Sequence, residues 1–206
     1  MRPGYKRTEV GVIPEEWSVK RFGDVASLRK ERVDPQRDSA HGFCVELKHV
    51  EPGTGQLIGD ASTGTQVSMK SVFRAGDVLF GKLRAYLRKH WLADRDGVCS
   101  TEFWVLSANR QLITPEYLFH SVTTQEFVEM ASMAYGTHMP RSDWNVVKDY
   151  MLSLPEVEEQ HLISSALNEV DSLISSLGRL IAKKRDIKQA AIQQLFTGKR
   201  RLPGFC

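Results

Sequence analysis

The last quarter of the chain carries a seven-residue repeat of apolar side chains that constrains the whole architecture. Six apolar residues fall at alternating steps of four and three: Ile163, Leu167, Val170, Ile174, Leu177 and Ile181. This spacing is typical of a coiled-coil seam. The repeat predicts a helix over residues 155–196, about 60 Å long at 1.5 Å per residue. A stripe of this length has to be covered by another long helix, and the sequence predicts no second one.

The charges of the predicted helix indicate how two copies would pair. Acidic residues occupy its first half and basic residues its second half: Glu156, Glu158, Glu159, Glu169 and Asp171, then Arg179, Lys183, Lys184, Arg185 and Lys188. This distribution also suits the dipole of a single helix. In an antiparallel pair, however, each acidic half would face a basic half. We therefore expect an antiparallel homodimer with the six seam residues at its interface. The alternative is that the helix packs on a different protein.

The length and charge of the chain set broad bounds on what it does. Its 206 residues predict one domain at residues 1–154 and a helical dimerisation region with a short tail at residues 155–206. The net charge of +3 permits a nucleic-acid partner without requiring one. Three cysteines, Cys44, Cys99 and Cys206, provide no disulfide framework, which favours the reducing cytoplasm. The N-terminus lacks a signal peptide and no apolar run reaches membrane-spanning length, so we expect no membrane partner.

Short apolar runs separated by turn residues predict a body of strands and helices. Alternation over residues 43–50 predicts a strand, and residues 98–106 are apolar on both faces, which is typical of a central strand. Thr114 and Pro115 predict a helix start, and the apolar pattern continues to Ala131. We expect an α+β fold, in which a mixed sheet-and-helix domain is followed by one long C-terminal helix.

Motifs of catalysis are sparse. The sequence contains no phosphate-binding glycine loop and no nucleophile elbow. Asp34 followed by Glu46 and Lys48 resembles the acidic site of metal-dependent endonucleases, and the expected strand would place Glu46 and Lys48 on one face. Two solvated charges on an outward strand face are the simpler interpretation. The histidines and cysteines match no zinc motif, so we expect no metal and no catalytic residue.

Two segments combine basic and hydrogen-bonding side chains and are candidates for contact with DNA. The first interleaves its bases with aliphatic and aromatic residues, and the second is shaped by a glycine and a proline. Together they supply Lys82, Arg84, Arg88, Lys89, Thr137, His138, Arg141 and Ser142. Basic side chains contact phosphates, and arginine can also read guanine edges. The alternatives are a solvated face beside a strand and an ordinary loop between helices.

Five short segments, spread over nearly the whole chain, carry a family resemblance. They are residues 11–17, 76–84, 99–103, 136–141 and 154–160, with the sequences GVIPEEW, GDVLFGKLR, CSTEF, GTHMPR and LPEVEEQ. Each segment is unspecific alone, but their order and spacing are specific. Together they resemble the specificity (S) subunit of type I restriction–modification systems.

The resemblance implies a DNA-recognition subunit that is not itself an enzyme. In that family a target recognition domain reads one half of a split DNA site and a long helix follows it, and most members hold two such units in one chain. This chain has one of each, so it resembles a half-size form that dimerises to restore two domains.

The resemblance also implies partners. They are double-stranded DNA, two copies of a methyltransferase (M) subunit that binds S-adenosylmethionine and methylates adenine, and in some systems a restriction (R) subunit. This chain itself would hold no cofactor. Two alternatives from other classes remain: an endonuclease centred on Asp34, Glu46 and Lys48, and a coiled-coil interaction module without a DNA role.

Overall fold

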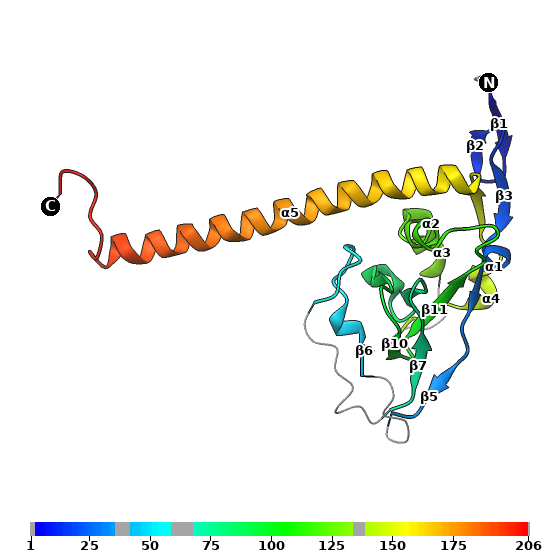
Figure 1. Cartoon of the computed structure of the whole chain (residues 1–206), viewed down its shortest axis with the longest axis horizontal. Helices are drawn as coiled ribbons and strands as arrows, with labels where there is room; N and C mark the ends of the chain where they lie inside the picture. Colours follow the sequence, from blue (N-terminus) through cyan, green and yellow to red (C-terminus); the bar gives the residue numbers. More distant parts are fainter. Residues whose placement is uncertain (1–2, 36–41, 59–67, 134–138, 206) are drawn as a thin grey trace. The chain divides into compact units, whose positions relative to one another are not determined.

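The computed structural model describes residues 3–35, 42–58, 68–133 and 139–205 (Figure 1). The chain divides into two compact units, Met1–Ser164 and Ser165–Cys206. The first unit is a mixed α+β domain, which confirms the expected fold class. It extends beyond the boundary expected at residue 154, because it includes the start of the long helix.

In the described parts of the first unit, eight strands build its centre. They are β4 (Ala26–Leu28), β5 (Arg32–Val33), β6 (Cys44–Val45), β7 (Lys70–Phe73), β8 (Val78–Gly81), β9 (His90–Leu92), β10 (Gly97–Ser100) and β11 (Phe103–Ala108). One sheet has the order β5-β7-β10-β6 and the other the order β4-β11-β8-β9. Within these two sheets, β6 and β10 pair in parallel and the other neighbours are antiparallel.

The single strand expected over residues 98–106 is wrong, because a turn divides it. Cys99 in β10 pairs with Val45 in β6, whereas Phe103 in β11 pairs with Gly81 in β8. The chain therefore moves from one sheet to the other within a few residues. The apolar pattern hides this break, since both strands are mostly buried. Glu102 lies in the turn between them, and its amide donates to Ser100 Oγ at 3.3 Å.

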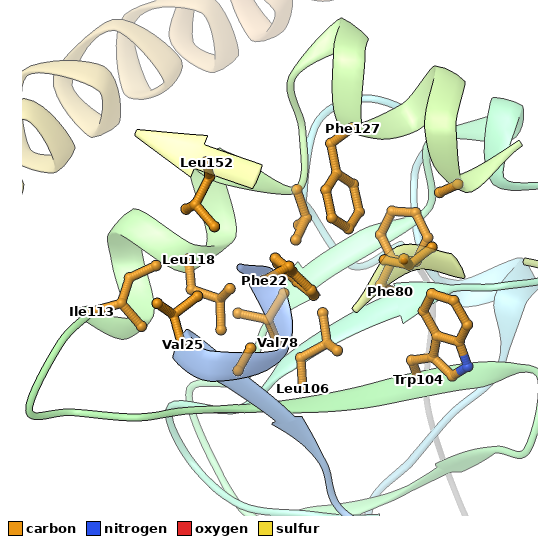
Figure 2. Close-up of a cluster of buried hydrophobic side chains, with 14 of the residues drawn as sticks. Phe22, Val25, Val78, Phe80, Trp104, Leu106, Ile113, Leu118, Phe127 and Leu152 are labelled. Atoms are coloured by element: carbon orange, nitrogen blue, oxygen red, sulfur yellow. The ribbon is translucent and has the colours of Figure 1, made fainter. Parts of the chain in front are cut away.

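Two apolar cores lie on opposite faces of the sheet that contains β8 and β11. Val78, Phe80, Trp104 and Leu106 belong to a core shared with helical residues such as Phe127 (Figure 2). The residues that alternate with these in β8 and β11 belong to a second core. That core is made of Val45, Val50, Phe73, Leu79, Trp91, Ala93, Cys99, Phe103 and Val105. All of β8 and most of β11 are therefore buried on both faces of the sheet.

The strand expected over residues 43–50 is also wrong beyond Val45. A 3₁₀ helix, η1 (Leu47–His49), follows β6 directly. Glu46 caps this helix: its side chain accepts from the amide of His49, and its own amide donates to His49 Nδ1 at 3.2 Å. These local hydrogen bonds compete with strand pairing and end the strand.

The described residues of this domain also form four short α-helices and a second 3₁₀ helix: α1 (Phe22–Val25), η2 (Ala85–Leu87), α2 (Pro115–Ser121), α3 (Gln125–Ala131) and α4 (Trp144–Val147). The helix start at Thr114 is confirmed, since Thr114 Oγ1 accepts from the amide of Tyr117 at 3.2 Å. The continuation to Ala131 is wrong, because a second threonine interrupts it. Thr124 Oγ1 accepts from the amide of Phe127 and starts a new helix.

The two ends of the first unit lie together. Near the N-terminus, β1 (Tyr5–Thr8) and β2 (Gly11–Pro14) form a hairpin, and β3 (Ser18–Arg21) pairs antiparallel with β12 (Met151–Leu154). The long helix, α5 (Val157–Phe196), follows β12 (Figure 1). Trp17 Nε1 donates to Glu159 Oε2 at 2.9 Å, which joins the N-terminal segment to the first turn of α5.

The predicted long helix is confirmed as a single uninterrupted helix of 40 residues. Beyond Ser164 it exposes its apolar seam: Leu167 41%, Val170 54%, Ile174 59%, Leu177 50% and Ile181 52%. Ile163, in the first unit, is half-buried. The offset residues Leu173, Leu180 and Ile187 are also at least half exposed. Within the described ranges, no helix has both the length and the apolar character that crossing a membrane requires.

Candidate nucleic-acid interface

Three of the five motif segments converge at one end of β8. The amide of Lys82 donates to the carbonyl of Glu102 at 3.0 Å, and the amide of Arg84 donates to the carbonyl of Pro140 at 2.9 Å. The amide of Ser142 returns to the carbonyl of Lys82 at 2.9 Å. These backbone bonds fix the strand end, the β10–β11 turn and the segment before α4 against one another. We call Lys82, Arg84, Glu102 and Arg141 the recognition cluster.

An ion pair is the best-defined interaction of the recognition cluster. Arg141 donates from Nε to Glu102 Oε2 and from Nη2 to Glu102 Oε1, both at 2.9 Å. The side chain of Arg141 is 47% exposed and that of Glu102 is 26% exposed. The hydrogen bonds from Arg141 lower the pKa of Glu102, so the carboxylate is ionised at neutral pH. Burial lowers the pKa of the half-buried Lys82.

The loop that carries Arg84 has an unusual backbone. Arg84 (φ 54°) and Arg88 (φ 51°) both adopt the left-handed conformation, one before and one after η2. Residues other than glycine rarely adopt this conformation, and it costs roughly 1–2 kcal/mol per residue. The chain therefore turns tightly on both sides of η2, and Ala85 is buried. Arg84 is exposed, as are Tyr86 (55%) and Leu87 (38%).

Two of the expected DNA contacts are engaged inside the protein. Lys89 Nζ donates to the carbonyls of Leu47 and Val50, at 2.7 and 2.9 Å. Arg88 donates from Nη1 to the carbonyl of Thr123 at 3.0 Å and from Nη2 to the side chain of Gln125. Both cations fasten the loop to neighbouring segments. The sequence suggested that Arg88 and Lys89 contact DNA because they lie beside other basic residues. It could not show that the fold brings backbone carbonyls within reach of both side chains.

The second candidate segment is only partly described. Thr137 and His138 lie outside the described residues. Ser142 is buried, and its hydroxyl lies 3.4 Å from the carbonyl of Lys82, to which it donates. Ser142 therefore helps to hold the backbone of Lys82 in place. Arg141 is the member of this segment that combines exposure with charge.

The endonuclease alternative loses the geometry on which it depended. Glu46 and Lys48 share no strand face, because β6 ends before both. Glu46 Oε1 accepts from Lys70 Nζ at 2.6 Å, and the side chain of Lys70 is only 3% exposed. The carboxylate is thus neutralised by a buried cation. Among the described residues, no three histidine, cysteine, aspartate or glutamate side chains are grouped to hold a metal ion.

The other two motif segments meet at the start of α5. Trp17 Nε1 of the first segment donates to Glu159 Oε2 of the second at 2.9 Å. Gln160 is completely buried, and its Nε2 donates to the carbonyls of Leu112 and Pro155, at 2.8 and 2.9 Å. This polar residue therefore holds the start of α5 against the domain.

The sequence analysis gave no role to two residues that the structure makes prominent, Glu102 and Gln160. Both lie inside the motif segments. Neither residue had a local signal in the sequence. Arg141, the partner of Glu102, is 39 residues away, and Thr114, whose amide donates to Gln160, is 46 residues away.

These features define a mixed α+β domain followed by a long helix with an exposed apolar seam. A family model described as "Type I restriction modification DNA specificity domain" matches residues 14–184. The chain therefore belongs to this family, as the resemblance predicted.

Individual relatives agree with this assignment. The chain is 25% identical over 201 residues to the type I restriction enzyme EcoDI specificity subunit of Escherichia coli, covering 94% of this chain and 44% of that protein. It is 23% identical to the MjaVIII specificity subunit of Methanocaldococcus jannaschii, covering 90% of this chain and 43% of that protein. The chain thus spans about half the length of these curated relatives.

Solved structures give the same result. The HsdS subunit from Thermoanaerobacter tengcongensis matches with a TM-score of 0.69 at 27% identity, over 94% of this chain and 52% of that one. A chain solved in work on complex assembly and conformational transition of the type I R-M system matches with a TM-score of 0.71 at 28% identity, with the same coverage.

Proposed function

We propose that this chain is the DNA-specificity component of a type I restriction–modification system, in half-size form and acting in the cytoplasm. It recognises one half of a bipartite target and has no catalytic centre of its own. The single observation that carries this proposal is the convergence of three family motifs on the recognition cluster, where the exposed side chains of Arg84 and Arg141 lie at the end of β8. Basic residues at such an edge can contact phosphates and base edges.

The chain acts as an antiparallel homodimer through α5. The support is the exposed seam, which a second copy would cover, and the acidic-then-basic order of the helix charges. Two copies would present two recognition domains, matching the full-length relatives, which are about twice as long. The dimer would position two methyltransferase subunits, which bring S-adenosylmethionine, and a restriction subunit where the system has one.

Symmetry determines the kind of target. Two identical recognition domains related by a two-fold axis satisfy a duplex only if both contact the same half-site on opposite strands. The target is therefore a split inverted repeat, with bases of free identity but fixed number between the halves.

Co-purification with the methyltransferase from the same genomic neighbourhood, followed by mapping of methylated adenines, tests this proposal. The expected map is one split inverted repeat. Two different half-sites or a continuous site would contradict the homodimer. If the purified complex bound no duplex even at low salt, the chain would be an interaction module. If the isolated chain cut DNA with a divalent metal, it would be an endonuclease.

A further inference from the structure

The ion pair of the recognition cluster uses only one edge of the Arg141 guanidinium. A guanidinium has five N–H donors in one plane. Glu102 accepts from the edge formed by Nε and Nη2 of Arg141. The edge formed by Nη1 and Nη2 still presents two parallel N–H groups. Among the described residues, no acceptor is found on that edge, and the side chain of Arg141 is 47% exposed.

The orientation of this free edge is fixed from both sides. Glu102 lies in the β10–β11 turn, where its amide donates to Ser100 Oγ and its carbonyl accepts from the amide of Lys82. Arg141 forms a backbone bridge with Leu83. The carboxylate and the guanidinium therefore come from separate segments, each anchored to the end of β8. A planar group held in this way cannot rotate freely to follow a phosphate.

The chemistry of the free edge favours one base. Two parallel N–H donors match two neighbouring acceptors, and guanine presents O6 and N7 in the major groove. Adenine presents one acceptor beside an amino group, and cytosine presents an amino group. On either base an amino donor would therefore face an N–H donor of the arginine. The nearby carboxylate also offsets the charge of Arg141, which makes it less suited to a phosphate than Arg84, for which the described part of the chain shows no ion-pair partner.

We propose that Arg141 reads one guanine in each half-site and that Glu102 is a positioning residue that holds its guanidinium for this contact. This inference rests on the proposed function and makes it more specific, because it predicts a G·C pair in every half-site. It also divides the cluster: Arg84 would contact the backbone of DNA, and Arg141 a base.

The test uses the complex of the full chain with its methyltransferase and the mapped target duplex. Each half-site guanine is replaced in turn, in both halves, by 7-deazaguanine, which lacks the N7 acceptor. The wild-type complex is expected to lose about tenfold or more in affinity at one guanine position only, as for one side of a bidentate contact. Arg141→Ala removes every donor of this side chain, and it should make binding insensitive to that replacement.

Glu102→Gln tests the positioning role. It should lower the ratio of target to non-specific affinity about tenfold, while affinity for non-specific duplex is unchanged or higher, because a negative charge is removed. Arg84→Ala is the matched control: it should weaken binding to all sequences alike and lower the salt slope by about one. Denaturation midpoints of all variants separate lost folding from lost recognition.

Three results would overturn the inference: a half-site without a G·C pair, no guanine position whose sensitivity disappears in Arg141→Ala, or a uniform loss of affinity in Glu102→Gln. The proposed function fails separately, if the wild-type complex methylates no split inverted repeat; the guanine contact would then fail with it.

Discussion

Gln160 Oε1 accepts a hydrogen bond from the backbone amide of Thr114 at 2.9 Å, although 46 residues separate the two in sequence. Thr114 is the N-cap of α2 and Gln160 lies in the first turn of α5. The bond therefore ties the start of the long helix to a helix of the recognition domain. Because Gln160 is completely buried, its amide also has to satisfy the carbonyls of Leu112 and Pro155.

Replacing this glutamine should destabilise the domain strongly. Gln160→Leu removes three hydrogen bonds and leaves buried backbone groups without partners, so we expect the free energy of unfolding to fall by about 2–4 kcal/mol. Chemical denaturation followed by circular dichroism measures the change. The matched control is Gln189→Leu, an exposed glutamine off the seam of the same helix. Equal effects of the two substitutions would contradict the role of Gln160.

His90 should make stability depend on pH. Burial lowers its pKa to about 4, with Arg88 and His120 adding to the shift. An unfolded histidine has a pKa of about 6.5, so between these values the unfolded state binds more protons. Stability should therefore fall as the pH drops from 6.5 to 4, by at most about 1.4 kcal/mol per pH unit.

His90→Leu removes this pH-dependent contribution to the free energy of unfolding. The stability difference between wild type and His90→Leu should change across this pH range, in favour of the variant at low pH. Val122→Ala, at a buried apolar position, is the control and should lower stability by a similar amount at every pH in this range. Parallel profiles for wild type and His90→Leu would show that another group is responsible.

The seam of α5 should control association. Ile174→Glu combined with Leu177→Glu places charges in the middle of the stripe, and light scattering should then report a monomer in place of a dimer. Ser172→Glu adds a charge on the opposite face of the helix and should leave the dimer intact. A dimer that survives the double substitution would exclude this interface.

The left-handed backbone of Arg84 predicts an inverted preference between glycine and alanine. Arg84→Gly should be more stable than Arg84→Ala by about 1 kcal/mol, because glycine adopts positive φ without a steric penalty. In α3, where φ is helical, Glu126→Ala should be more stable than Glu126→Gly by a similar amount. Thermal unfolding of the four variants checks both orders. The same order at both positions would argue against strain at Arg84.

The length of α5 should set the gap in the DNA target. Inserting seven residues after Ser175 adds two helical turns, about 10 Å. Methylation mapping should then show the same half-sites with a longer gap. The same insertion after Gly198, beyond the helix, should leave the gap unchanged. An altered half-site would mean that the helix contributes to base recognition itself.

Regular patterns in the sequence predicted the larger features, and local competition decided the rest. The heptad repeat was sufficient to predict α5, and the threonine and proline at its N-terminus were sufficient to predict the start of α2. The strand over residues 43–50 failed because Glu46 and His49 exchange hydrogen bonds that end it. The strand over residues 98–106 failed because a turn interrupts an unbroken apolar run.

The candidate site was predictable in composition more than in geometry. Arg84 and Arg141 are exposed, as a DNA contact requires. Lys89 was assigned to the same surface, but its ammonium group donates to two carbonyls that only the folded chain brings near. The pairing of Glu102 with Arg141 joins positions 39 residues apart, which no local pattern encodes.

The uncovered seam of α5 also affects how a cell handles the chain. Long exposed apolar stripes are what chaperones and proteases engage on incomplete proteins. A chain whose seam stays uncovered would be removed, so the amount that persists would follow the rate of assembly more than the rate of synthesis. The level of the chain can then match that of the helix that covers the seam without a dedicated regulator.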